Sequence, residues 1–148
     1  MGWNSAHFNG HVVAQTDHSI IMHFSSSLNI DSFHLVNVYC PSSRPQRDEF
    51  VTWMNDLHID SALNWIFLGD FNFYRSIQNR NRPGGDMNDI FLFNDLISNL
   101  GLIEVPLKGR SFTRSNMQDN PLLEQLDWVF TTPNWSITYP QHAGFGSA

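Results

Sequence analysis

The stretch Trp65-Ile66-Phe67-Leu68-Gly69-Asp70-Phe71-Asn72 decides the fold and the site that we expect in this chain. Its first four residues form a continuous apolar run, which is typical of a buried central strand. If the strand continues to Asn72, Asp70 and Asn72 point to the same face at its carboxyl end, where α/β sheets commonly bind ligands. A carboxylate can orient water and an amide can donate to an anionic oxygen, which suits phosphate-ester hydrolysis. The same tetrapeptide, Gly-Asp-x-Asn, is also common in turns.

The residues before this stretch predict a hairpin, a strand and a helix. Residues 11–16 and 19–24 suit the two arms of a hairpin. Residues 33–40 alternate, so Asn37 and Tyr39 share one face. A helix is expected over 45–57, because apolar residues recur there at helical spacing and Ser43 is a plausible cap.

The residues after the stretch predict a polar loop over 74–87, a second helix and several short strands. The helix is expected from 88 or 89 to 100, with Asp86 and Asn88 as capping residues and Gly101 as its stop. Strands are expected near 102–105, 111–113 and 125–130, and Asp127 lies within the last of these. The pattern predicts a strand-rich α/β or α+β sandwich with mixed connections.

Composition and charge limit the classes of protein to which this chain can belong. The 148 residues fit a single domain, and 41% of them are apolar. A net charge of −6 argues against a globally basic nucleic-acid binder and against a polybasic membrane protein. All eight Lys and Arg fall between Arg44 and Arg114, and Arg75, Arg80 and Arg82 follow the expected site closely. One cysteine and no visible signal or membrane-spanning segment predict an intracellular protein, nuclear or cytoplasmic.

Three motifs carry a resemblance to a known superfamily. NVYCP (37–41), WIFLGDFN (65–72) and LDWVF (126–130) occur in the order and approximate spacing of the endonuclease/exonuclease/phosphatase superfamily. Within it, residues 69–130 resemble the endonuclease domain of plant LINE-type (non-LTR) retrotransposon polyproteins. The match covers residues 25–140 and implies a partial DNase I-like fold, truncated at both ends, with mixed sheets flanked by helices. The whole chain, 1–148, is then one incomplete domain.

The resemblance also implies roles for individual residues. Asp70 would orient and activate water and contact a Mg²⁺ ion, and Asn72 would steady the phosphate. Tyr39 would hydrogen-bond near the phosphate, and Asp127 would orient a late histidine. The parent polyprotein would also carry a reverse transcriptase domain. Apart from the resemblance, Arg75, Arg80 and Arg82 lie beside the expected site and suit contacts with a nucleic-acid backbone, with a solvated surface loop as the alternative. Asn37, on the same face as Tyr39, is a further candidate for contact with DNA.

The sequence departs from the superfamily pattern at three places. No Glu precedes Glu49, whereas the family carries a metal-binding Glu on an early strand. No acidic residue follows Asp127, and His142 lacks the Asp that precedes the family's terminal His. The family's Phe-Thr-Trp appears as Phe-Thr-Arg, ending at Arg114. We therefore expect a catalytically impaired endonuclease fragment. The alternatives are a small-molecule phosphatase of the same superfamily and a non-catalytic structural or interaction remnant.

A structural consequence is expected as well. Without the first strands and the last strand of the superfamily's sandwich, the apolar side chains of Trp65, Phe67 and Trp128 would lose part of their cover. Exposed apolar sheet edges favour aggregation, so we expect marginal stability for the chain on its own.

Overall fold

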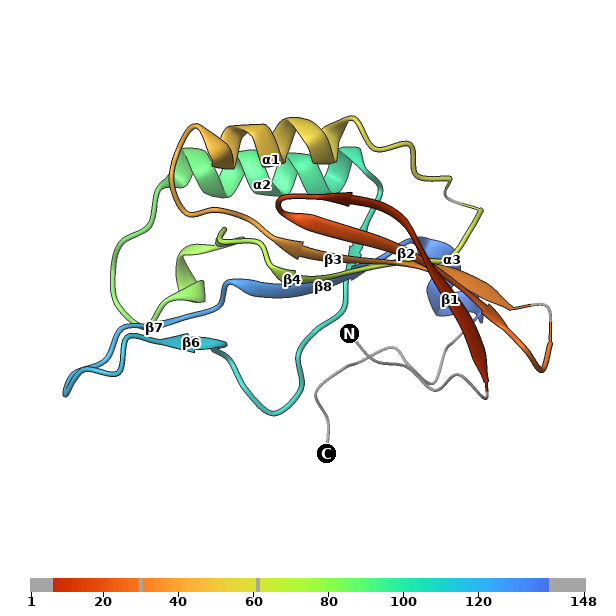
Figure 1. The fold of residues 1–148 in the computed structure, drawn as a ribbon. Coiled ribbons are helices and arrows are strands. Elements are labelled where there is room, and N and C mark those ends of the chain that lie inside the picture. Colours follow the sequence, from red (N-terminus) through yellow and green to blue (C-terminus); the bar gives the residue numbers. More distant parts are fainter. Residues whose placement is uncertain (1–6, 30, 61, 139–148) are drawn as a thin grey trace.

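The computed structural model describes residues 7–29, 31–60 and 62–138 and contains a mixed sheet covered on one face by two helices (Figure 1). The sheet has six strands in the order β1-β2-β3-β4-β8-β5. Helices α1 (Gln46–Asn55) and α2 (Met87–Asn99) lie side by side over it. A separate two-stranded sheet pairs β6 (Arg114–Ser115) with β7 (Leu123–Glu124). The predicted class, α/β with mixed strands and flanking helices, is confirmed.

The first half of the sheet is an antiparallel meander. It consists of β1 (Phe8–Thr16), β2 (Ser19–Ser26) and β3 (Ser32–Tyr39). The predicted hairpin is confirmed, with Thr16 opposite Ser19 across its turn. A bulge between Val12 and Ala14 shifts the register of β1, which forms one edge of the sheet.

The centre of the sheet is formed by β4 (Trp65–Asp70), which lies parallel to β3 and antiparallel to β8 (Asp127–Thr131). Helix α1 makes the crossover from β3 to β4, as parallel neighbours require. The expected cap of α1 is wrong: Pro45 occupies the N-cap position without a side-chain bond, and Ser43 contributes only its backbone oxygen.

The second half of the chain follows the predicted helix closely and the predicted strands less well. Asp86 caps α2 by accepting from the Asn88 backbone N–H, and Gly101 follows with a positive φ of 67°. The strand expected at 111–113 is wrong, since β6 begins at Arg114. The remaining elements are β5 (Ile103–Glu104), a 3-10 turn η1 (Ile77–Asn79) and α3 (Pro133–Thr138).

The core between the sheet and the two helices is rich in aromatic rings. Phe67, Phe71, Phe93 and Phe130 are fully buried. The rings of Phe71, Phe93 and Phe130 pack edge-on or tilted against one another, and the Phe67 ring stacks on Trp65. Trp128 lies beside Phe130 and donates its indole N–H to the Phe73 carbonyl. The expectation that Trp65, Phe67 and Trp128 lack cover is therefore wrong, because all three are buried. No helix among the described residues is long and apolar enough to cross a bilayer.

A row of histidines crosses the sheet at the end of β4 opposite to Asp70. His11, His23 and His34 are register partners on β1, β2 and β3, and the His34 ring stacks on Trp65 with 4.2 Å between centroids. Burial lowers the pKa of His34, and the neighbouring His23 and His11 lower it further. The folded state therefore binds a proton at His34 less readily than the unfolded chain does.

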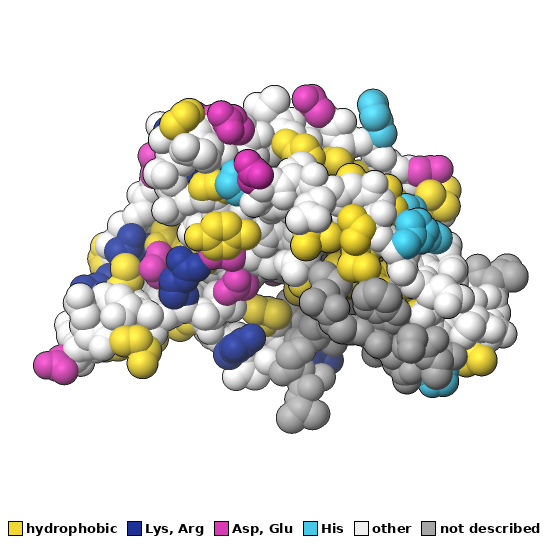
Figure 2. Space-filling view, viewed as in Figure 1, with side chains coloured by type: hydrophobic (Ala, Val, Ile, Leu, Met, Phe, Trp, Pro, Cys, Tyr) yellow, Lys and Arg dark blue, Asp and Glu magenta, His cyan; other side chains and the backbone are white. Residues whose placement is uncertain are grey.

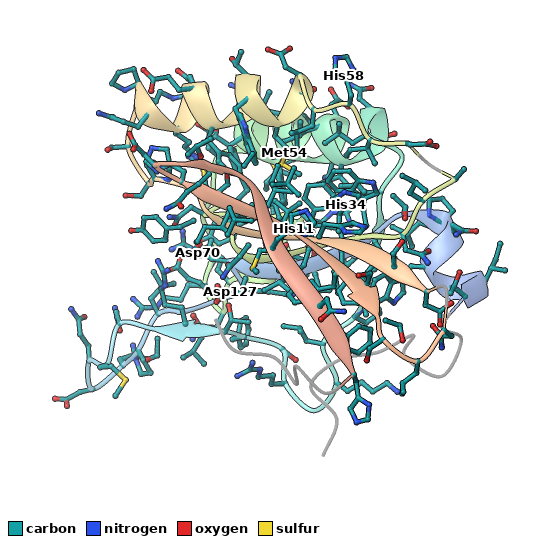
Figure 3. The ribbon with its side chains drawn as sticks, turned by 45° about the vertical axis from the view of Figure 1, so that its right-hand side comes forward. His11, His34, Met54, His58, Asp70 and Asp127 are labelled. Carbon is teal, nitrogen blue, oxygen red and sulfur yellow. The ribbon has the colours of Figure 1, made fainter. Side chains whose placement is uncertain are left out.

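We expect stability to fall as the pH drops below the ordinary histidine value of 6.5 and through the lower pKa of His34. Replacing His34 with Phe keeps an aromatic ring on Trp65 and removes the titrating group. Thermal melts between pH 7.5 and 5 should show a smaller loss for His34→Phe than for the wild type. His58, exposed beyond the end of α1 (Figure 3), provides the comparison: His58→Gln removes one histidine and leaves the ring stack of His34 on Trp65 in place.

Candidate active site

Three of the predicted site residues form a row across neighbouring strands. Tyr39 on β3 is the register partner of Asp70 on β4, and Asp70 is the register partner of Asp127 on β8. Register partners on adjacent strands point to the same face, so the phenol and the two carboxylates emerge together. Figure 3 shows Asp70 and Asp127 close together at this end of the sheet. The Tyr39 side chain is 61% exposed and therefore accessible to a substrate.

Asn72 reaches the site by a different route from the one expected. The strand ends at Asp70, so the prediction that an extended strand carries both side chains to one face is wrong. Asn72 instead adopts a left-handed conformation with φ of 53°, which Asn tolerates better than most residues. Its backbone N–H donates to Asp70 Oδ1 at 2.9 Å. Gly69 and Asp70 are thus the last residues of β4, and the Asp70 side chain forms a turn with the Asn72 backbone, which places Asn72 next to the Asp70 carboxylate.

Two further contacts fix Asn72. Its side-chain Nδ2 donates to the Cys40 carbonyl at 2.5 Å, and Arg47 donates to the Asn72 carbonyl at 2.5 Å. The Arg47 guanidinium also lies 3.8 Å from the Phe73 ring centroid and pairs with Asp89 on α2 at 2.9 Å. Arg47 therefore links helices α1 and α2 to the turn that contains Asn72. The sequence pattern gave it no role, because nothing local shows which distant carbonyl a helical arginine reaches.

The charge on Asp70 is balanced by an arginine that the sequence analysis did not place in the site. Arg114, on β6, forms an ion pair with Asp70 Oδ2. The Asp70 side chain is only 12% exposed. Burial raises the pKa of the Asp70 carboxyl above its usual value, and the charge of Asp127 acts in the same direction. The Asn72 N–H and the Arg114 guanidinium oppose this rise.

Asp127 is positioned by Thr113. The Thr113 hydroxyl accepts from the backbone N–H groups of Leu126 and Asp127, at 3.1 and 3.2 Å. This contact holds the start of β8 against the segment that leads into β6. The histidine that the resemblance pairs with Asp127 would correspond most nearly to His142, which lies outside the described residues.

The arginines expected to contact DNA occupy different environments. Arg75 donates to Asn94 and Glu104 at 2.8 and 2.7 Å, so two of its groups are used within the fold. Arg80 lies over the Tyr74 ring, and Arg82 donates to the Asn120 carbonyl from an exposed position. A role for these residues in DNA contact stays a prediction. On the face seen in Figure 2, acidic and basic side chains lie side by side between the helices and the β6–β7 sheet.

Two hollows flank the row of site residues. One, of about 220 Å³, is lined by Arg47, Asn72 and Glu124, among others. The other, of about 230 Å³, is lined by Asn37 and Tyr39 together with the turn of the β1–β2 hairpin. Asn37, a predicted DNA contact, therefore lies beside Tyr39, as its shared face of β3 required. The first hollow is mainly polar and the second is of mixed polarity, and each is lined by one candidate site residue, Asn72 and Tyr39 respectively.

The described residues do not fit a resident Mg²⁺ ion. Magnesium prefers several oxygen ligands in octahedral geometry. Among residues 7–29, 31–60 and 62–138, no group of three or more His, Cys, Asp and Glu side chains is placed to hold a metal. Both Asp70 oxygens have partners within the chain, Oδ1 the Asn72 N–H and Oδ2 the Arg114 guanidinium. The family-implied ion therefore lacks a ready site in this part of the chain.

Cys40 does not supply an alternative nucleophile. Its side chain is fully buried where β3 ends. Burial raises the pKa of the thiol to about 12, so the thiol stays protonated at neutral pH.

Several solved structures have a fold similar to that of this chain. The endonuclease domain of TRAS1, a telomere-specific non-LTR retrotransposon, matches with a TM-score of 0.67 and 14% identity over 86% of this chain and 57% of that one. An AP endonuclease from Archaeoglobus fulgidus matches at 0.57, with 11% identity over 79% and 54%. An endonuclease/exonuclease/phosphatase family protein from Bacteroides thetaiotaomicron matches at 0.53, with 16% identity over 88% and 54%.

The similarity extends over only part of these structures. The chain spans little more than half the length of each of the three proteins. No family model matches the sequence, and no curated protein matches it either.

Proposed function

We propose that the chain is part of a DNA endonuclease domain of the LINE type, which hydrolyses phosphodiester bonds. The likeness of its fold to solved endonuclease/exonuclease/phosphatase structures, among them a retrotransposon endonuclease domain, supports this proposal. The observation that carries this proposal is the row Tyr39–Asp70–Asp127, with Asn72 bonded to Asp70 at the end of the central strand. DNA as substrate and a retroelement polyprotein with a reverse transcriptase domain as the parent are parts of the same proposal.

Each side chain has a role that its chemistry permits. Asp70, with a raised pKa, is suited to orient a water molecule and accept a proton from it. Asn72 has a second amide hydrogen beyond the one given to Cys40, and it can donate this to a phosphate oxygen without adding charge. The exposed Tyr39 hydroxyl can donate to the same phosphate. Asp127, next to Asp70, would orient a protonated partner group.

We also propose that the chain on its own is catalytically impaired. The Asp70 carboxylate is occupied by Arg114, and the described residues bring no third metal-binding side chain to it. Without a metal ion, the developing charge on a departing alkoxide lacks its main stabilisation, which costs several kcal/mol, roughly 3 or more.

A pair of chromogenic substrates tests the reaction class. Bis(p-nitrophenyl) phosphate has a good leaving group, so even an impaired diesterase should hydrolyse it slowly. We expect Asp70→Asn and Asn72→Ala to lower this rate at least about tenfold. The exposed Asp60 gives the control, since Asp60→Asn should leave the rate unchanged. Faster hydrolysis of the monoester p-nitrophenyl phosphate would favour the phosphatase alternative. A hydrolysis rate that Asp70→Asn leaves unchanged would favour the non-catalytic remnant.

A plasmid assay tests the impairment separately. With Mg²⁺ and supercoiled DNA, the wild-type chain should nick no faster than Asp70→Ala. Robust nicking that this substitution abolishes would show that the chain is a competent endonuclease and would overturn the impairment.

A further inference from the structure

Arg114 places a positive charge directly beside Asp70. The guanidinium reaches from the β6–β7 sheet to the end of the main sheet and contacts Asp70 Oδ2. Among the described residues, Asp70 forms no other ion pair. The contact joins residues 44 positions apart, so the tertiary fold creates it.

The surroundings of this ion pair favour the presence of a positive charge. Asp70 is largely buried and has a second carboxylate, Asp127, as its register partner. Two adjacent carboxylates repel each other and together attract a cation. Arg114 is 44% exposed, so its charge is offered from the solvent side, which is also the side from which an ion would approach. A guanidinium cannot be deprotonated in a protein, so it is a permanent counter-ion.

We infer that Arg114 is a built-in counter-ion that excludes a divalent cation from Asp70 and Asp127. This inference rests on the proposed function, because it concerns the regulation of the same site. It assigns to Arg114 one part of the lack of fit between the described residues and Mg²⁺, in addition to the absence of a third metal-binding side chain among these residues. Removal of the guanidinium would leave the two carboxylates without a positive charge, and a divalent cation could then take its place.

Binding of Mn²⁺, measured by electron paramagnetic resonance without any substrate, tests the inference. We expect Arg114→Gln to bind Mn²⁺ at least about tenfold more tightly than the wild type, a change equal to about 1.4 kcal/mol. The gain should vanish in the double variant Asp70→Asn/Arg114→Gln. Arg110→Gln is the matched control, because Arg110 is an exposed arginine in the same segment without an ion pair to a described residue.

Two results would overturn the inference. One is Asp70-dependent Mn²⁺ binding by the wild type that Arg114→Gln changes less than twofold. The other is an Arg114→Gln protein that melts as the wild type does and binds no more Mn²⁺. Arg114→Met provides a second variant if the Gln variant fails to fold. The measurement involves no turnover, so its result is independent of the hydrolysis assays. Tighter Mn²⁺ binding by Arg114→Gln together with no diester hydrolysis would contradict the proposed function but support the role of Arg114 as a counter-ion.

Discussion

Substitution of Gly69 with Ala should destabilise the protein by about 3 kcal/mol or more, the largest effect that we expect from a single added methyl group. Gly69 has φ of +129°, a conformation that is essentially restricted to glycine. A Cβ there would lie 2.2 Å from the carbonyl oxygen of Val38, its register partner on β3. Neither strand can yield easily, because the clash is with backbone at the centre of the sheet. Urea unfolding followed by tryptophan fluorescence measures the loss.

Gly109 separates the two causes of this effect. It also has a positive φ, +80°, but an added Cβ would meet nothing within 4 Å. Gly109→Ala should therefore cost only the conformational part, about 1 kcal/mol. Equal losses at the two positions would show that the close approach of β3 and β4 at Gly69 is unimportant. The same approach aligns Tyr39 with Asp70, so Gly69→Ala should also disturb the candidate site.

The sequence predicts the elements whose signals are local. The apolar run 65–68 becomes the central strand, the alternation over 33–40 becomes β3, and Asp86 caps α2 as expected. Periodicity and capping depend on residues a few positions apart, so one sequence is enough to detect them. The motif residues Tyr39, Asp70 and Asp127 come together for a related reason: each lies at the same end of a strand in one sheet.

What the sequence does not predict depends on contacts between distant segments. Arg114 reaches Asp70 across 44 positions, and Arg47 reaches Asn72 across 25. The Phe-Thr-Arg departure from the family pattern marks Arg114 as unusual but does not show its partner. Arg75 shows the same limit, because its place in a cluster of basic residues does not reveal which groups it reaches within the fold. The structure gives it Glu104 and Asn94 as partners.

The local conformation of Asn72 is the most instructive difference. The apolar run gives no sign that the strand ends at Asp70, and an extended strand would also have placed both side chains on one face. The turn achieves the proximity by a hydrogen bond from the Asn72 backbone to Asp70 Oδ1. Asn72 is therefore held by the carboxylate it is proposed to work beside. From the sequence, this stretch could serve either as a turn or as part of a catalytic site. In the fold it can do both, because the hydrogen bond that forms the turn also holds Asn72 beside Asp70.

Substitution of Phe93 with Ala should cost about 3–5 kcal/mol, the usual range for a buried phenylalanine. The ring is fully buried on α2 and contacts four other aromatic rings, stacking on Phe73 with 5.0 Å between centroids. Phe91, two residues away on the same helix, is 59% exposed and provides the matched control. Phe91→Ala should change the free energy of unfolding by no more than about 0.5 kcal/mol.

The effect of Phe93→Ala should extend to the candidate site. Phe71 and Phe73, which flank Asn72 in the chain, both pack on the Phe93 ring, at 5.5 and 5.0 Å. Their burial anchors both ends of the left-handed turn, so a cavity at Phe93 frees the segment that carries Asn72. NMR resonances of the Asn72 side-chain amide should therefore shift in Phe93→Ala and stay in place in Phe91→Ala. Unshifted resonances in a destabilised Phe93→Ala protein would mean that Cys40 and Arg47 hold the turn without help from the core.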